Sequence, residues 1–115
     1  MTVHKGRIFH LVTPERWRKV LIEGHYRPDS LRSDRFIHCS TWEQLIESAE
    51  LHFPNHDELI ALCILEKRAK KHLVWEKGRN DQLFPHLYGE FPFDAVEATK
   101  LLVRNPEGKF ELASE

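Results

Sequence analysis

Three histidines stand inside or at the end of short apolar runs, in segments far apart along the chain: His10, His38 and His86. A histidine side chain changes charge near neutral pH, so it can move a proton, hold a phosphate or bind a metal. Three such side chains on three separate elements of a small protein predict that they line one ligand-binding or catalytic site. We therefore predict His10 and His38 as catalytic residues and His86 as a ligand-binding residue.

The segment Phe36–Ser40 carries the strongest signal. His38 and Ser40 stand two positions apart in a predicted strand, so their side chains point the same way and can grip a phosphate or a ribose hydroxyl. Ser40 also opens the capping-box pattern Ser-Thr-Trp-Glu, which predicts a helix N-terminus whose free N–H groups favour an anion. The simpler alternative is that Ser40 only caps the helix and His38 packs beside it.

His10 stands in the middle of a predicted strand, and alternation places it on the same face as Ile8 and Val12. The alternative to a catalytic role is a core histidine with one ring nitrogen bonded to a backbone carbonyl. The residue pattern leaves both interpretations open.

Two segments predicted as loops add ligand-binding candidates. Tyr26 and Ser30 stand in the polar stretch 25–35, where loop side chains often contact ligands. The aromatic stretch 84–89 places Tyr88 two positions after His86, and either ring can stack on a ligand. The alternatives are an ordinary surface connection and a loop anchored on the core by its aromatic side chains.

Other chemistries find less support. The eight histidines and two cysteines show no HExxH or CxxC spacing, so we predict no metal site. The absence of a GxSxG elbow argues against a serine hydrolase. The basic cluster at 67–71 favours a solvated face over a phosphate clamp.

The length and net charge of the chain further limit the classes of function and partner that we consider. The 115 residues fit one domain, 1–115, and the formal net charge of −1 provides no global positive field for nucleic acid, so RNA ends are the only nucleic-acid partner considered. No apolar run is long enough to span a membrane, and neither a signal peptide nor a disulfide framework is evident. We predict a cytoplasmic protein whose partner is a small-molecule nucleotide.

Apolar periodicity and turn residues predict the elements around these side chains. Strands are predicted at 7–12, 36–39, 58–66, 73–75, 96–103 and 110–112. Helices are predicted at 14–23, between Thr13 as N-cap and Gly24 as stop, and at about 41–53. The regular alternation of strand and helix ends after the second helix, so the order predicts an α+β fold rather than a doubly wound parallel sheet.

The pieces Ile8-Phe9-His10, Phe36-Ile37-His38-Cys39-Ser40 and Phe84-Pro85-His86-Leu87-Tyr88-Gly89 together resemble the bacterial domain-of-unknown-function family 952. The resemblance runs from Ile8 to about Phe110. The family label itself implies no activity.

The order of the same pieces is more distantly similar to the ADP-ribosyltransferase superfamily, in its RNA 2′-phosphotransferase branch. This resemblance implies a split, mostly antiparallel β-sandwich with two helices and a cleft that holds NAD. It also implies that His10 faces the nicotinamide ribose and that His38 lines the same cleft. His86 or Leu87 would stand near the third motif position, where many of these enzymes place a glutamate.

The chain departs from that pattern at two places. Leu11 and Val12 follow His10 where small residues are usual, and no glutamate stands clearly at the third position, although Glu90 is near. We therefore keep three hypotheses: an ADP-ribosyltransferase-like protein that binds NAD or an ADP-ribosyl ligand, a histidine-dependent phosphoesterase acting on RNA ends or cyclic nucleotides, and a non-catalytic binding module.

Overall fold

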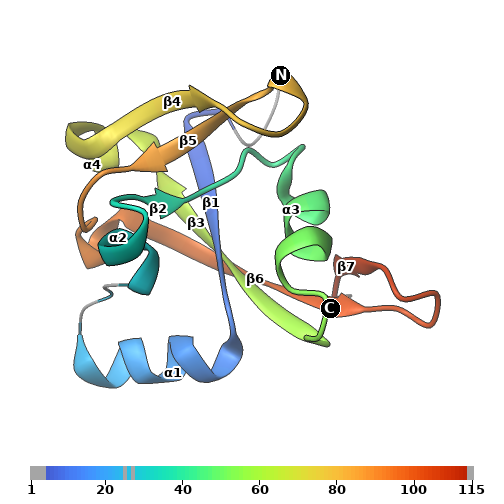
Figure 1. The fold of residues 1–115 in the computed structure, drawn as a ribbon. Helices are drawn as coiled ribbons and strands as arrows, with labels where there is room; N and C mark the ends of the chain where they lie inside the picture. The colour runs from blue at the N-terminus through green and yellow to red at the C-terminus, as the bar shows by residue number, and fades with distance from the viewer. Residues whose placement is uncertain (1–4, 25, 27, 114–115) are drawn as a thin grey trace.

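The computed structural model describes residues 5–24, 26 and 28–113, except for the side chains of residues 29 and 30. Two antiparallel sheets and a few helices form an α+β fold (Figure 1), which confirms the predicted class. The first sheet has the strand order β1-β3-β6-β7, and its strands are β1 (Arg7–Val12), β3 (Glu58–Leu65), β6 (Val96–Arg104) and β7 (Phe110–Leu112). The second has the order β2-β5-β4, and its strands are β2 (Ile37–His38), β4 (Leu73–Lys77) and β5 (Leu83–Leu87).

The two sheets meet at one point, where β1 passes the chain that follows β2. Phe9 and Ser40 exchange both backbone hydrogen bonds there, at 2.8 and 2.7 Å. On either side of this bridge, β1 pairs with β3 in one sheet and β2 pairs with β5 in the other. The sheets therefore share a seam at His10, His38 and Ser40 and separate away from it.

Helices and short 3-10 turns connect the strands. The helices are α1 (Pro14–Glu23), α2 (Asp29–Ser33), α3 (Leu45–His52) and α4 (Glu66–Ala69), and the 3-10 turns are η1 (Lys70–His72), η2 (Arg79–Asp81) and η3 (Phe93–Ala95). In Figure 1, α1 runs along the edge of the molecule below the sheets, and α3 lies beside β7. No helix in the described part of the chain is both long and apolar enough to cross a membrane.

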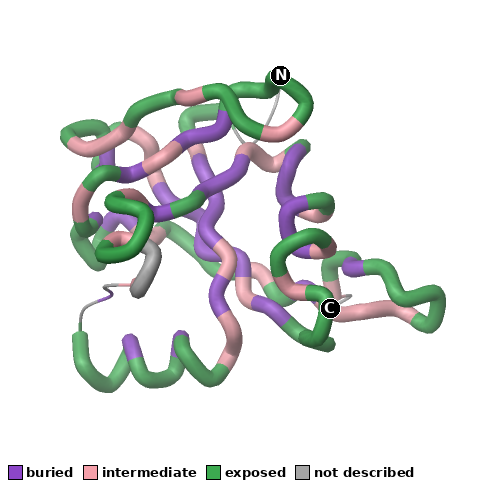
Figure 2. Tube along the Cα trace, in the orientation of Figure 1, coloured by how far each residue is buried: buried purple, intermediate pink, exposed green. Residues whose placement is uncertain are grey.

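Strand alternation divides the core as predicted. Ile8 and Val12 pack into a cluster with residues of α1 and the second sheet, whereas Phe9 packs into another cluster against α3 and β7. The central strand β3 contributes alternate residues to both clusters and is buried along most of its length (Figure 2). The apolar run 58–66 thus behaves as a strand covered on both faces.

Two local predictions are wrong. The stretch 84–89 was predicted as a loop, but it is mostly the strand β5, which lies between β2 and β4. Proline is tolerated in this central strand because β2 has only two residues, and Pro85 still accepts a backbone bond from Cys39. The polar stretch 25–35 was predicted as a loop but holds the short helix α2.

The second helix begins later than predicted. The Ser40 capping box does not form, and α3 begins at Leu45. Instead, Thr41 and Gln44 cap each other: the Thr41 N–H donates to Gln44 Oε1 at 3.0 Å, and the Gln44 N–H donates to Thr41 Oγ1 at 3.3 Å. The motif is therefore displaced by one residue, because the backbone of Ser40 is already held by its bridge to Phe9.

Candidate functional site

His10 lies at the seam between the sheets, and its side chain is buried with Tyr26. The ring Nδ1 is 2.6 Å from the His38 carbonyl oxygen, and Nε2 is 2.6 Å from the Tyr26 hydroxyl. A carbonyl oxygen can only accept, so His10 Nδ1–H is the donor and Nε2 accepts from Tyr26. Only 7% of each of these two residues is exposed.

Burial decides the charge of His10. Desolvation lowers the pKa of His10 to about 4, and the bond to the His38 carbonyl offsets only part of that effect. At neutral pH the ring is therefore uncharged, and both of its nitrogens are occupied by protein partners. In this structure His10 holds Tyr26 and the backbone of His38, while its catalytic role stays a prediction.

The side chain of His38 points away from His10, onto the outer face of the second sheet. His38 pairs with His86 across β2 and β5, with ring centroids 5.8 Å apart. Each histidine has a carboxylate partner: His38 Nε2 is 2.9 Å from Asp34 Oδ2, and His86 Nδ1 is 2.7 Å from Glu76 Oε1. Each ring therefore keeps one nitrogen without a partner in the described part of the chain.

Aromatic rings complete this face. Phe36 stacks on His86 with centroids 4.1 Å apart and lies 5.3 Å from the Tyr88 ring. The Tyr88 hydroxyl donates to Glu76 Oε1 at 2.6 Å, and 41% of Tyr88 is exposed. We call this group the His38–His86 surface; its members are Phe36, His38, Glu76, His86 and Tyr88.

Glu76 is the shared hydrogen-bond acceptor of Tyr88 and His86 on this surface. The hydrogen bonds from Tyr88 and then from His86 lower the pKa of Glu76, so it is a carboxylate at neutral pH. The same carboxylate raises the pKa of Tyr88, which stays a protonated donor. Both bonds fall on Oε1, so Oε2 has no hydrogen-bond partner in the described part of the chain and can accept one from a ligand hydroxyl.

Ser40 lies apart from this face, which corrects the predicted pairing with His38. Its hydroxyl is buried and donates to Ser48 on α3 at 3.0 Å, because the strand β2 ends at His38 and no longer imposes alternation. Arg79 also donates to Ser48, at 3.2 Å, and pairs with Glu47 at 2.9 Å. Ser40 therefore anchors α3 to the seam.

His52, at the end of α3, borders the same region. Its ring centroid is 6.5 Å from that of His38. Partial burial, followed by the nearby charges of His38 and Arg79, lowers the pKa of His52. The sequence around His52 holds no signal that would bring this residue to His38.

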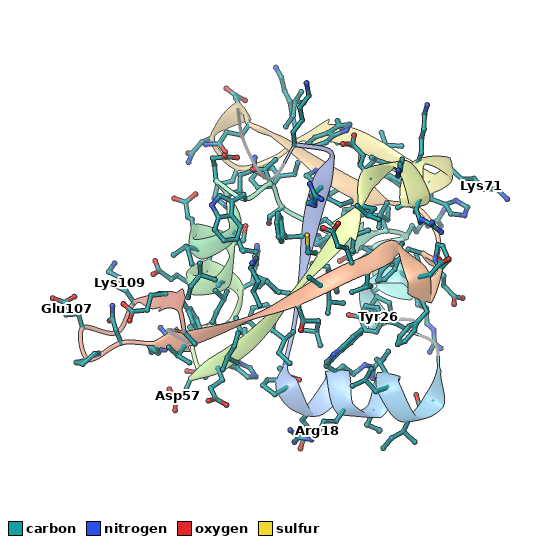
Figure 3. All side chains as sticks on the ribbon, turned by 180° about the vertical axis from the view of Figure 1, so that it is seen from behind. Arg18, Tyr26, Asp57, Lys71, Glu107 and Lys109 are labelled. Atoms are coloured by element: carbon teal, nitrogen blue, oxygen red, sulfur yellow. The ribbon has the colours of Figure 1, made fainter. Side chains whose placement is uncertain are left out.

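The structure thus divides the predicted site residues. His38, His86 and Tyr88 come together on one exposed face, His10 and Tyr26 form a buried pair (Figure 3 labels Tyr26), and the side chain of Ser30 lies outside the described residues. The sequence-based prediction missed Phe36 and Glu76. Recognising β5 as a strand would have paired it with β4 and brought Glu76 to His86.

The described residues form neither a metal-binding cluster nor an activated thiol. No group of three or more histidine, cysteine or acidic side chains is arranged among these residues to hold a metal ion. Cys39 and Cys63 are both free and buried, and burial raises the pKa of each thiol.

Comparisons with known proteins place this geometry in a family. The chain is similar to CC0527 from Caulobacter crescentus, whose crystal structure gives a TM-score of 0.82 at 25% identity over 91% of this chain and 93% of that one. A solution NMR structure of CC0527 gives a TM-score of 0.77 at 26% identity over 90% of both chains. No protein with curated function matches. Residues 11–99 match the family described as protein of unknown function (DUF952), and the chain therefore belongs to the DUF952 family.

Proposed function

We propose that this protein binds a nucleotide, NAD or an ADP-ribosyl compound, at the His38–His86 surface. The observation that carries the proposal is the meeting of aromatic rings, two histidines and an ionised carboxylate on one face of a three-stranded sheet. Ligand sites commonly combine aromatic walls with a few convergent polar groups.

Each group suits one part of such a ligand. Tyr88, with 41% of its area exposed, offers a ring for stacking on a base or on nicotinamide. Oε2 of Glu76 can accept a bond from a ribose hydroxyl. Nδ1 of His38, the ring nitrogen that does not face Asp34, can donate to a phosphate oxygen when the ring is protonated.

The proposal includes the hypothesis that this protein is ADP-ribosyltransferase-like. The two antiparallel sheets that meet at the Phe9–Ser40 bridge agree with the architecture that the resemblance implies, and the ligand is proposed on the outer face of the second sheet rather than between the sheets. If the protein transfers ADP-ribose, nicotinamide leaves through an oxocarbenium-like state that placement and nearby negative charge stabilise. Glu76 would supply the carboxylate that the sequence pattern did not locate at the third motif position.

Titration calorimetry with NAD, ADP-ribose, nicotinamide and a 2′-phosphorylated nucleotide tests the proposal. We expect NAD or ADP-ribose to bind, and His38→Ala and Glu76→Gln each to weaken binding at least tenfold without changing the fold. His56→Ala is the matched control, because His56 is exposed and contacts Phe53 rather than the His38–His86 surface.

Absence of binding by all four compounds would overturn the nucleotide proposal. Release of nicotinamide from NAD by the wild-type protein, lost in Glu76→Gln, would identify a transferase or hydrolase. Tight binding without release would identify a non-catalytic binding module.

A second candidate function is hydrolysis of a phosphodiester. The pair formed by His38 and His86 favours it, because each ring is oriented by a carboxylate and keeps one nitrogen without a partner in the described part of the chain. One histidine would take a proton from water while the other protonates the leaving oxygen. Hydrolysis of a 2′,3′-cyclic nucleotide that disappears in both His38→Ala and His86→Ala would support this function, and no turnover by the wild type would exclude it for that substrate.

A further inference from the structure

A hollow lies at the N-terminal end of β1, away from the His38–His86 surface. Its lining comes from the start of β1, the end of β3, and the helical turns α4 and η1 that follow β3. Its volume is about 480 Å³. Its charged lining residues are Lys5, Arg7, Glu66, Lys67 and Lys70. This hollow shares no residue with the His38–His86 surface.

The cations of the hollow fall into two groups. Arg7 is already neutralised, because Glu97 accepts hydrogen bonds from both Nε and Nη2. The ammonium groups of Lys5, Lys67 and Lys70 form no ion pair within residues 5–24, 26 and 28–113. Three lysines without an ion pair in the described part of the chain therefore surround one hollow, against the single carboxylate of Glu66, in a chain whose formal net charge is −1.

The lysines approach the hollow from separate segments. Lys67 and Lys70 stand three positions apart in successive helical turns and so share a face, whereas Lys5 comes from the segment before β1. Between them, Gly6 has a φ of 77° and nothing within 4 Å of the place where a Cβ would lie. The wall is thus open at Gly6, and its backbone can be approached closely.

We propose that this hollow binds the adjacent phosphates of a diphosphate-containing small molecule. Like charges held around one space repel each other, and a bound anion relieves that repulsion. An ammonium group is a compact charge that suits phosphate oxygens. Lysines on two sides of the hollow match two phosphates better than one, and a space of this size admits a small molecule that carries them.

The basic cluster at 67–71 was predicted to be a solvated face. The structure separates its members: Lys67 and Lys70 line the hollow, whereas Arg68 pairs with Asp94 at 2.8 Å and Lys71 extends outward (Figure 3). Their closeness in the sequence does not show which of these side chains line the hollow and which do not.

Inorganic pyrophosphate is the first probe, since it has no ring to stack on Tyr88. Binding is followed by calorimetry and by amide chemical shifts in the full chain, at low and at moderate salt. We expect a saturable Kd that weakens as salt rises, with shifts at Gly6, Glu66 and Lys67. The double variant Lys67→Gln with Lys70→Gln should weaken binding about tenfold or more.

Lys109→Gln is the matched control, because Lys109 lies at the tip of the β6–β7 hairpin, at the opposite end of the molecule from Lys71 (Figure 3). Pyrophosphate binding that is absent, or equally strong in the double variant, overturns the proposal. A parallel titration with ADP distinguishes the source: additional affinity over pyrophosphate, kept in His38→Ala, indicates a nucleotide, and equal affinity indicates that the phosphates alone are recognised.

Discussion

His10 and His38 are joined by one hydrogen bond, but their rings lie in opposite environments. The ring of His10 is buried, uncharged and bonded at both nitrogens, whereas 53% of the His38 side chain is exposed and one nitrogen has no partner in the described part of the chain. Similar local sequences, an apolar run containing a histidine, thus produce a core residue in one strand and a candidate site residue in the other.

The difference follows from the strands that carry them. β1 is covered by the second sheet and α1 on the face that holds His10, so a polar ring there must find partners within the protein. β2 is a short strand whose outer face carries only His38, and its neighbour β5 places His86 beside it. A buried histidine therefore contributes to stability, whereas the exposed His38, beside the partly buried His86, can contribute to binding.

The largest expected effect is that of His10→Ala. The substitution leaves a cavity and removes the partners of the Tyr26 hydroxyl and the His38 carbonyl, both at the seam. We expect a loss of about 3–5 kcal/mol of unfolding free energy, measured by urea denaturation. A loss below about 1 kcal/mol would show that His10 is not a core residue.

Acid should weaken the protein through the same residue. In the unfolded chain His10 binds a proton with a pKa near 6.5, whereas in the folded protein the buried His10 binds one only as the pH approaches about 4. The stability is therefore complete above pH 6.5 and is lost as the pH falls, by about 2 kcal/mol between pH 7 and pH 5. Urea titrations at several pH values should show this slope in wild type and His56→Ala, and a flatter one in His10→Gln.

Tyr26→Phe removes one hydroxyl and keeps the ring. His10 Nε2 then loses its donor in a buried place, and we expect a loss of about 1–2 kcal/mol of unfolding free energy. Thermal denaturation measures the effect. Unchanged stability would mean that water replaces the hydroxyl and that the pair is less enclosed than its burial indicates.

The smallest effect on stability is expected from His38→Ala. The residue is exposed, its ion pair with Asp34 is a surface pair, and the unfolding free energy should change by no more than about 0.5 kcal/mol. Urea denaturation of this variant beside His10→Ala gives the contrast directly. Equal destabilisation by the two substitutions would remove the distinction between core and site.

Much of the fold was predictable because local patterns and burial agree. Thr13 caps α1 and Gly24 ends it with a φ of 85°, as their residue types indicated. The run 58–66 is the buried strand β3, and alternation in β1 places Ile8 and Val12 in one cluster and Phe9 in the other. In each case one short segment holds the whole signal.

The candidate site was predictable only in part. His38, His86 and Tyr88 were identified by residue type, but their common face depends on the register of β2 with β5. Glu76 reaches His86 only through the pairing of β4 with β5. Pro85 concealed that pairing, because proline in a short apolar stretch indicates a loop unless the neighbouring strand is known to be short.

The amino-acid sequence by itself determined the α+β class, the two main helices and which residues of β1 share a face, since these depend on periodicity, capping and turn residues within a few positions of one another. Only the tertiary structure decided which histidine is buried, which carboxylate His38 and His86 each meet and which lysines line one hollow. Those properties depend on strand register and on solvent exclusion by distant segments, and neither is encoded in the spacing of neighbouring residues.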